Sequence, residues 1–527
     1  MNSPTRSSLP APAAALVGLL SVAAALGVGH LVAALVSPTA SPFLAVGGSA
    51  IDLTPTSLKD FAVRTFGTYD KLVLLLGMAV VLGLFAVLAG LLSRRSRTPG
   101  LVLLVLLGAV GGVAVLARPA AETLDVLAPL AALIVGVGVF ATLHRLARPT
   151  SPAPVSPPPA VEPTPDTGDT EGVPRRRLLV GSAAVAVGAG LAGGGGQLLA
   201  GRADVDASRR AIGRIVPDVP APAIPPGADF AADGSPSFLT PTRDFYRVDI
   251  NLTLPQVRAE DWRLRIHGMV DRELTLDWGD LTSRRLVERT VTMTCVSNEV
   301  GGPYVSTSNF TGVLLADILK EAGVRPGADQ VFTTSDDGWT CGTPTATVVD
   351  PGREAMLVVA MNNEPLPIEH GFPVRMLVPG LYGFVSGTKW IVDMELTTFA
   401  AKQAYWLQRD WGQRAPIKTM SRIDRPGSFE RISPDSPLTG IAWAQTKGID
   451  KVEVRLDRGE WQPAELSTEV NIDTWRMWRL RPGRLQSGLH TIEVRATDKT
   501  GYTQTMDRAM PIPEGASGWH SVQFTVQ

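Results

Sequence analysis

The chain has 527 residues, of which 19% are charged, and its formal net charge is −1 at pH 7. A balance this close to neutral argues against a nucleic-acid partner, because nucleic-acid-binding domains carry a clear basic excess. The two cysteines exclude a disulfide framework and any four-cysteine zinc or iron–sulfur site within the chain. No Cys-x-x-Cys-His motif occurs, so the sequence predicts no covalently attached haem, and we expect no haem within this chain.

Charged residues are scarce in the first 200 positions, where four apolar runs are long enough to cross a hydrocarbon core of ~30 Å. These runs are Ala11–Val36, Leu72–Leu92, Leu101–Ala117 and Val126–Leu143. Arginines follow the second and the fourth run, so the positive-inside rule places both ends of this four-helix unit, residues 1–148, in the cytoplasm.

A proline-rich segment with three arginines at its end, residues 149–177, is predicted to be an unstructured cytoplasmic linker. The Ala/Gly-rich run 178–200 that follows is interpreted either as a fifth transmembrane span or as a twin-arginine-like signal anchor. Both alternatives place everything after about Gly201 outside the cytoplasm. The sequence therefore predicts a multi-pass cell-membrane protein, with the lipid bilayer as one partner and an extracytoplasmic soluble region.

The soluble region divides into three segments that differ in composition and in their pattern of predicted strands and helices. Residues 201–236 are rich in Pro, Ala and Asp and are predicted to form a tether. Residues 237–405 combine short strands with one modest helix, typical of a β-rich α+β domain, and we expect Thr311 to cap that helix and Gly323 to end it. The predicted buried face of the helix is formed by Leu315, Ile318, Leu319 and Ala322. Residues 406–527 show short alternating strands at regular spacing, typical of an immunoglobulin-like β-sandwich.

One of the two cysteines stands at the end of a predicted strand. The stretch Thr290–Cys295 alternates threonines with Val291, Met293 and Cys295, the period of two typical of a half-buried strand. A polar loop that ends in two glycines follows. A thiol in this position is either a packed free cysteine or a group with a chemical role, and this stretch alone leaves both interpretations open.

Three cationic side chains further along are suited to holding phosphate. Arg375 presents five donors in a planar fork, and His370 adds another donor. Lys389 follows a loop of small and polar residues whose amides could line an anion. Taken singly, each is explained equally well by a structural ion pair. Together they indicate a thiolate accompanied by several phosphate donors.

From about Thr240 onward the chain resembles the sulfite oxidase family of molybdopterin-dependent oxidoreductases. Five segments carry the resemblance in the family's order: FYRVD (Phe245–Asp249), TCVSNEVGG (Thr294–Gly302), MNNEPLPIEHGFPVRMLVPGLYG (Met361–Gly383), SGTKW (Ser386–Trp390) and GASGWHSV (Gly515–Val522).

The resemblance implies a molybdopterin-binding catalytic domain in residues 237–405. It also implies a dimerisation-type domain in residues 406–527, through which the chain would form a homodimer. Cys295 matches the family's molybdenum ligand, and Asn298, close to it, is assigned a catalytic role in shaping the pocket. The residues assigned to cofactor contacts are Phe245, Tyr246, Arg247, Asp336, His370, Arg375, Ser386, Thr388 and Lys389.

The activity implied is oxygen-atom transfer, with a molybdenum-molybdopterin cofactor, to or from a small sulfur-containing or similar substrate. Electrons would be exchanged with a separate carrier, a cytochrome or a quinone. Two departures argue against sulfite itself. The Cys-Ala-Gly-Asn-Arg-Arg motif of sulfite oxidases reads Cys295-Val-Ser-Asn-Glu-Val300 here, which removes charge-assisted donors to a dianion. The family's active-site tyrosine has no counterpart, and Trp339 or Cys341 lies near its expected place.

A different class of protein is the alternative. The soluble region would then be a non-catalytic cell-surface binding or adhesion protein in which Cys295 and Cys341 form a disulfide, as an extracytoplasmic location permits. That alternative leaves the grouped His370, Arg375 and Lys389 unexplained.

A topology measurement tests the predicted spans. A reporter that is active only outside the cytoplasm is expected to be active when fused after Gly201, because five spans precede that point. The same reporter fused after Arg148 is the matched control and is expected to be inactive. Activity after Arg148 but not after Gly201 would contradict the predicted orientation.

Overall fold

The computed structural model divides into two compact units, one formed by residues 1–203 with 251–253 and the other by residues 204–250 and 254–527. Residues 149–171 of the predicted linker lie outside the described part of the chain. The structure describes residues 8–55, 58, 61, 65–66, 69–118, 121–148, 172–200, 205–250 and 252–527.

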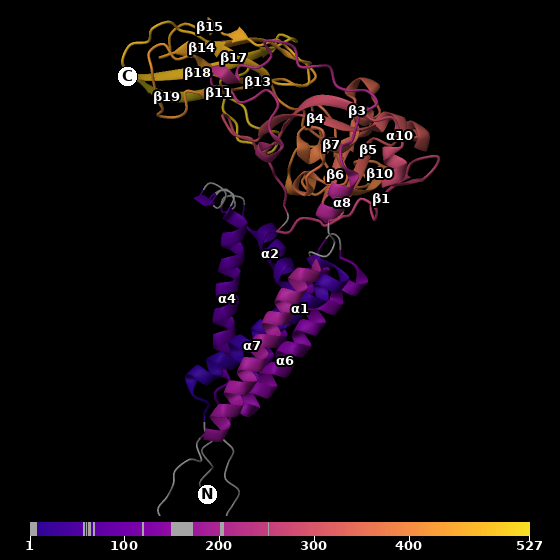
Figure 1. Ribbon diagram of the computed structural model, residues 1–527, viewed down its shortest axis with the longest axis vertical. Coiled ribbons are helices and arrows are strands. Elements are labelled where there is room, and N and C mark those ends of the chain that lie inside the picture. The colour runs from indigo at the N-terminus through magenta and orange to yellow at the C-terminus, as the bar shows by residue number, and fades with distance from the viewer. Residues whose placement is uncertain are drawn as a thin grey trace, which may run out of the picture. The chain divides into compact units, whose positions relative to one another are not determined.

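The first unit is built from long apolar helices (Figure 1). They are α1 (Ala11–Val36), α4 (Asp70–Leu92), α5 (Thr98–Leu116), α6 (Leu127–Leu146) and α7 (Gly172–Ala200). The shorter elements among them are η1 (Pro38–Ala40), α2 (Pro42–Leu53) and η3 (Thr123–Val126). By length and composition, five helices of the described residues could each cross a membrane, and they coincide with the five apolar segments of the sequence.

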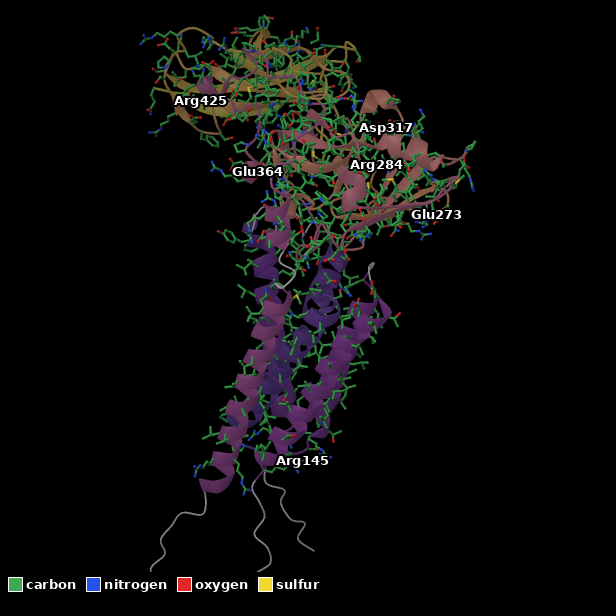
Figure 2. All side chains as sticks on the ribbon, turned by 45° about the vertical axis from the view of Figure 1, so that its right-hand side comes forward. Arg145, Glu273, Arg284, Asp317, Glu364 and Arg425 are labelled. Atoms are coloured by element: carbon green, nitrogen blue, oxygen red, sulfur yellow. The ribbon has the colours of Figure 1, made fainter. Side chains whose placement is uncertain are left out.

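Helix α1 packs against α4, α6 and α7. Glycines permit the close approach of α1 and α4, since a Cβ added to Gly18 would lie 1.9 Å from the carbonyl oxygen of Ala86. Large apolar side chains point outward, and Leu84 is 65% exposed. Figure 2 shows that the side chains along these helices are almost entirely carbon, with charged groups such as Arg145 near the helix ends. Such an exterior suits an apolar solvent better than water.

The second unit begins with one mixed sheet and one antiparallel sheet. One sheet has the order β2-β1-β10-β5-β6, with β1 and β10 parallel and the other pairs antiparallel. Its strands are β1 (Arg263–Gly268), β2 (Leu274–Asp277), β5 (Gln330–Ser335), β6 (Thr340–Pro344) and β10 (Ile391–Thr397). The other sheet has the order β3-β4-β7-β8, with β9 paired to β7. Its strands are β3 (Val287–Thr294), β4 (Val305–Leu314), β7 (Met356–Met361), β8 (Glu364–Pro365) and β9 (Arg375–Leu377).

Short helices accompany these sheets: α8 (Val205–Ile212), α9 (Trp278–Thr282), α10 (Leu315–Ala322) and α11 (Thr345–Val348). Helix α10 buries the predicted apolar face and ends at Gly323, which has a left-handed φ of 70°. The predicted cap was wrong. Thr311 lies within β4, and the residue that precedes α10 is Leu314, which offers no side-chain oxygen to the helix.

The C-terminal part consists of two further sheets, with the orders β11-β13-β17-β16 and β12-β19-β18-β14-β15. Buried residues from both sheets, among them Leu438, Trp478, Val494 and Phe524, form one core, so the sheets pack face to face. The strands are β11 (Met420–Arg425), β12 (Arg431–Ile432), β13 (Leu438–Trp443), β14 (Ile449–Leu456), β15 (Gln462–Pro463), β16 (Glu465–Leu466), β17 (Arg476–Leu480), β18 (Gly488–Asp498) and β19 (His520–Val526).

The segment predicted to be a tether is instead part of the folded second unit. Residues 205–212 form α8, and the backbone of Val219 pairs with Val287 of β3 in a parallel bridge. Ile215 and Phe230 are buried in the main core. The proline-rich composition concealed these apolar anchors, which fix the segment because their burial removes apolar surface from water.

Candidate functional site

Strand β3 delivers Cys295 to a tight turn. The Cys295 amide donates to the Tyr304 carbonyl at 3.0 Å, and the Asn298 amide donates to the Cys295 carbonyl at 3.1 Å. Both cysteines are buried and free, so the disulfide of the alternative interpretation is not formed. The prediction of a half-buried strand was wrong, because the alternating threonines are buried as well. The C-terminal sheets cover that face of β3.

A pocket opens beside Cys295. Residues from β3, the segment before β1, the β5–β6 turn and the loops around β9 line it. Six of the residues assigned from the sequence lie in its wall: Phe245, Tyr246, Cys295, His370, Arg375 and Lys389.

Arg375 is the most unusual group in the pocket. It is 5% exposed, and no carboxylate of the described residues pairs with it. Its Nη1 donates to the His370 carbonyl at 3.3 Å, whereas its Nε has no hydrogen-bond partner within the described residues. Burial lowers the pKa of this guanidinium to about 10. A buried charge without a partner is strongly unfavourable, so the pocket is suited to receive an anion.

Lys389 supplies a second positive charge. Its Nζ donates to the Glu369 carbonyl at 3.0 Å and lies 3.5 Å from Asp249 Oδ2. The same carboxylate accepts a hydrogen bond of 2.7 Å from Arg247. Burial lowers the pKa of Lys389 to about 8, while Asp249 acts in the opposite direction. The ammonium group is therefore held by one carboxylate that it shares with Arg247.

His370 is neutral in this arrangement. It is 4% exposed, and its ring meets the Phe245 ring edge to face at 5.4 Å between centroids. Burial lowers its pKa to about 3, and the charges of Arg375, Lys389 and Arg247 lower it further. A neutral imidazole can still donate one hydrogen bond.

The surroundings of Cys295 favour a thiolate only if a further positive charge arrives. Burial raises the pKa of the thiol. Hydrogen bonds from Ser297 and Val296 to the sulfur, together with the charge of Lys389, act in the opposite direction. A metal ion bound to the sulfur would lower the pKa of the thiol much further, because a coordinating thiol is deprotonated outright.

The other residues assigned from the sequence lie around the pocket rather than in its wall. Asn298 braces the cysteine loop, since its Oδ1 accepts from the Tyr304 amide at 2.9 Å. Ser386 bonds the carbonyls of its own turn, and Thr388 bonds Thr333 across 2.6 Å. Asp336 is exposed, and its amide donates to the Trp390 carbonyl. Its neighbours in sequence, Ser335 and Asp337, line the pocket instead, as does Asp249.

An aromatic wall closes the pocket, and most of it was missed from the sequence. It consists of Trp339, Phe384, Trp406 and Trp411. Trp411 meets Phe384 at 5.3 Å and Trp406 at 4.9 Å between ring centroids. Trp406 and Trp411 flank the short helix η9 (Leu407–Arg409) and lie beyond the predicted domain boundary. The sequence feature that could have indicated these residues is the density of aromatic residues in a segment without strand periodicity.

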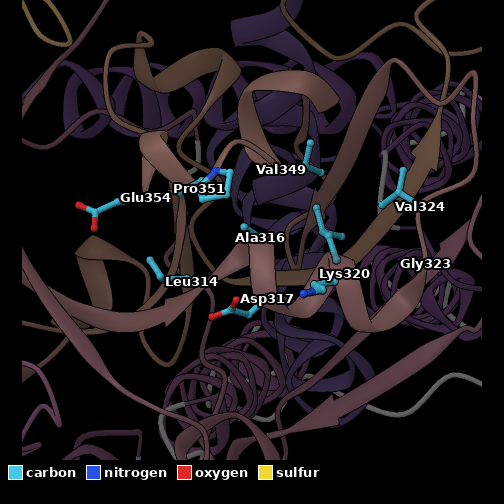
Figure 3. Close-up of a pocket in the computed structure, with 11 residues that line it drawn as sticks. Leu314, Ala316, Asp317, Lys320, Gly323, Val324, Val349, Pro351 and Glu354 are labelled. Carbon is cyan, nitrogen blue, oxygen red and sulfur yellow. The ribbon is translucent and has the colours of Figure 1, made fainter.

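A second pocket lies beside α10 and is lined by Leu314, Asp317, Lys320, Val324 and Glu354, among others (Figure 3). Glu354 is paired with Arg289 at 2.6 Å. This pocket contains no cysteine, histidine or unpartnered buried cation. The chemistry is therefore concentrated beside Cys295.

The donor set beside Cys295 fits an anionic, metal-bearing cofactor. Two buried polar atoms in the wall, Arg375 Nε and Ser335 Oγ, lack partners within the described residues. The turn behind the guanidinium is closely packed, because a Cβ added at Gly387 would lie 3.0 Å from the Gly383 carbonyl oxygen and 3.3 Å from Arg375 Nη2. Phosphate groups would satisfy the guanidinium, and the thiol offers one soft ligand to a metal.

Comparison with known proteins agrees with this chemistry. Residues 251–406 match the oxidoreductase molybdopterin binding domain. The chain is 28% identical over 343 residues to mitochondrial sulfite oxidase of Homo sapiens, covering 55% of this chain and 62% of that protein. It is 29% identical over 337 residues to the NADH nitrate reductase of Spinacia oleracea, covering 51% of this chain and 35% of that protein. The chain thus spans less than two thirds of the length of these relatives.

A solved structure, that of the sulfane dehydrogenase SoxCD from Paracoccus pantotrophus, aligns with 58% of this chain and 88% of that chain. The identity is 20% and the TM-score 0.48. The sequence matches establish the class: the chain carries a molybdopterin-binding oxidoreductase domain. Over 55% of its length, the chain is similar in sequence to a sulfite oxidase.

Acidification is expected to destabilise the second unit in part through His370. Its pKa is about 3 in the folded chain against an ordinary 6.5, so the unfolded chain binds a proton first. The stabilising contribution is therefore complete above about pH 6.5 and falls as the pH drops toward about 3. His370→Asn should flatten the decline of the urea midpoint between about pH 7.5 and about pH 4.5.

Tryptophan fluorescence of the full-length chain is the measurement, because all 11 tryptophans lie in the second unit. An equal decline in the wild type and in His370→Asn would contradict this assignment.

Proposed function

We propose that the chain is a membrane-anchored molybdenum enzyme that catalyses oxygen-atom transfer at an extracytoplasmic site. The observation that carries the proposal is the buried Arg375, which has no carboxylate partner within the described residues, in a pocket that also holds the free thiol of Cys295. An unpaired guanidinium is costly to bury in an ordinary core, whereas a buried thiol is common and gains a role here only through its place beside that charge. Both become favourable when an anionic cofactor supplies phosphate to the arginine and a metal to the thiol.

Each residue of the pocket has a defined task in this proposal. Arg375 and Lys389 bind the phosphate of molybdopterin, and His370 donates one further hydrogen bond. Cys295 is the protein's ligand to molybdenum, and Phe245 packs beside the pterin ring. When bound, the molybdenum-molybdopterin group supplies the oxygen-atom transfer chemistry. The protein binds and orients the group and excludes water from it.

The substrate proposed is a small neutral sulfur compound, a sulfoxide or the corresponding thioether, rather than sulfite. The loop after Cys295 carries Glu299 and Val300, so it offers no cationic fork to a dianion. The wall of Trp406 and Trp411 offers apolar contact instead.

The remaining parts of the chain take supporting roles. The five apolar helices anchor the enzyme in the cell membrane, with the Arg-Arg-Arg segment at 175–177 on the cytoplasmic side, where it would serve a twin-arginine route. The catalytic domain runs from about residue 237 to about residue 411, because both tryptophans of the wall belong to it. The C-terminal sheets form an immunoglobulin-like domain that supports a homodimer. A separate cytochrome or quinone exchanges electrons with the site.

Removing the unpaired cation tests the cofactor assignment. Arg375→Met should lower the molybdopterin and molybdenum content of the purified chain by at least about tenfold, because the phosphate loses its charge-assisted donor. The cofactor-free variant should unfold at the same temperature as the cofactor-free wild type or a higher one, because an uncompensated buried charge is removed.

Arg289→Met is the matched control. Arg289 is half-buried like many structural arginines, but it is paired with Glu354. This variant should keep its cofactor and lose some stability. Full cofactor content in Arg375→Met would contradict the assignment.

A substrate comparison tests the aromatic wall. With artificial electron carriers, kcat/KM for methyl phenyl sulfoxide should exceed that for sulfite by roughly 100-fold, since bidentate donors to a dianion are absent. Trp411→Ala should raise KM for methyl phenyl sulfoxide about tenfold and leave dimethyl sulfoxide nearly unchanged, as loss of one aromatic contact implies. Trp461→Ala, in a tryptophan stacked between two arginines of the C-terminal sheets, is the control. Rapid turnover of sulfite would contradict the proposal.

A further inference from the structure

The C-terminal part of the chain holds the strand that delivers Cys295, along its free backbone edge and at two of its threonine hydroxyls. The Asn471 amide group donates to the Thr290 carbonyl at 3.0 Å. The Thr292 hydroxyl accepts from the Trp475 amide at 2.7 Å, and the Thr292 amide donates to the Asp473 carbonyl at 3.0 Å.

Gln445 continues the series nearer to the cysteine. Its Nε2 donates to the Thr292 carbonyl at 3.0 Å and to the Thr294 hydroxyl at 3.3 Å. These groups are buried, so each hydrogen bond also avoids an unsatisfied polar atom in the interior. The last residue before Cys295 is thus fixed by the C-terminal part of the chain.

The loop on the other side of Cys295 is held from the same direction. Arg422 of β11 donates from Nη1 to the Gly302 carbonyl at 3.0 Å and from Nε to Asp424 at 2.7 Å. His520 of β19 packs against Gly301 so closely that an added Cβ would lie 2.2 Å from its Nε2. Gly301 has a left-handed φ of 82°, a conformation that glycine adopts without strain.

His520 is itself fixed in place. Its Nδ1 accepts from the Ile423 amide at 3.0 Å, which assigns the proton of the neutral ring to Nε2, the nitrogen that faces Gly301. This residue belongs to the segment GASGWHSV, whose first glycine packs against the Tyr382 hydroxyl, and Tyr382 opens the loop before Lys389. Two loops of the pocket are therefore seated on one C-terminal segment.

We propose that the C-terminal sheets are a positioning element of the catalytic site, with Arg422 and His520 as the positioning residues that set the place of the Cys295 sulfur. The inference rests on the proposed function, because the position of the sulfur matters for catalysis only if Cys295 is a metal ligand. Neither residue lines the pocket. They act through the loop Asn298–Gly302, which both residues hold at its C-terminal end.

The test measures the reactivity of Cys295 in full-length chain prepared without molybdenum cofactor. Alkylation by iodoacetamide is followed by peptide mass spectrometry, with Cys341, which is 0% exposed, as the internal reference. Arg422→Met is expected to raise the alkylation rate of Cys295 about tenfold, because loss of one hydrogen bond loosens the loop. Arg422→Lys, which keeps one donor, should restore most of the protection.

Arg495→Met is the matched control. Arg495 lies in the same sheets as His520, is half-buried and is paired with a carboxylate, Glu453, but touches neither β3 nor the loop. Its variant should alkylate at the wild-type rate. A wild-type rate in Arg422→Met would overturn the proposal, and so would an equal rise in Arg495→Met.

A second variant keeps the test decisive if Arg422→Met does not fold. Gly301→Ala introduces a contact with His520 and should raise the Cys295 rate, and adding His520→Ala should reverse the rise in part. Gly483→Ala is its control, because Gly483 has a similar φ of 77° with nothing within 4 Å of the added Cβ. Equal rates for Gly301→Ala and Gly483→Ala would overturn the proposal.

A spectroscopic and kinetic measurement on the molybdenum-containing enzyme distinguishes this proposal from the proposed function. In Arg422→Met with full molybdenum content, the g-values of the Mo(V) electron paramagnetic resonance signal should shift, and kcat should fall about tenfold with KM unchanged. Absence of molybdenum from the wild type would contradict the proposed function alone, since the alkylation result does not depend on metal. A wild-type Mo(V) signal in Arg422→Met would overturn the positioning role.

Discussion

A buried guanidinium without a carboxylate partner dominates the energetics of the pocket. Moving a charge from water into the protein interior costs free energy. Attraction to an opposite charge close by is needed to offset that cost. Arg375 has a single backbone acceptor within the described residues and a free Nε. Lys389 adds a second charge that shares its carboxylate with Arg247. The fold therefore maintains a concentration of positive charge that only an anionic ligand compensates.

Strand β3 connects this pocket to the rest of the second unit. Its valine and methionine face packs toward the pocket, and its free edge and threonine side chains are bound by side chains and backbone of the C-terminal part of the chain. A strand that is covered on both faces has few alternative positions, because a shift of one residue would exchange its two faces. The position of Cys295 is restricted in the same way, because the residue directly follows this strand. The loop beyond it is held by Arg422 and His520.

Local patterns predicted the elements well and their surroundings less well. The alternation before Cys295 and the apolar face of α10 follow from periodicity, and the five apolar segments follow from their length and lack of charge. Both signals depend only on neighbouring residues. The capping role of Thr311 failed because pairing with β7 extended β4 past that residue. The segment 205–236 looked like a tether because its anchors, Ile215 and Phe230, are isolated among prolines. Trp406 and Trp411 reach the pocket through tertiary packing, and their local density of aromatic residues does not say which surface they line.

In the proposed enzyme, Cys295 ligates a molybdenum ion held by molybdopterin. X-ray absorption spectroscopy at the molybdenum edge tests it directly, because scattering by sulfur neighbours counts the ligands of the metal. We expect three sulfur neighbours in the wild-type chain, two from the pterin and one from the protein, and one fewer in Cys295→Ser. The same sulfur count in both proteins would contradict it.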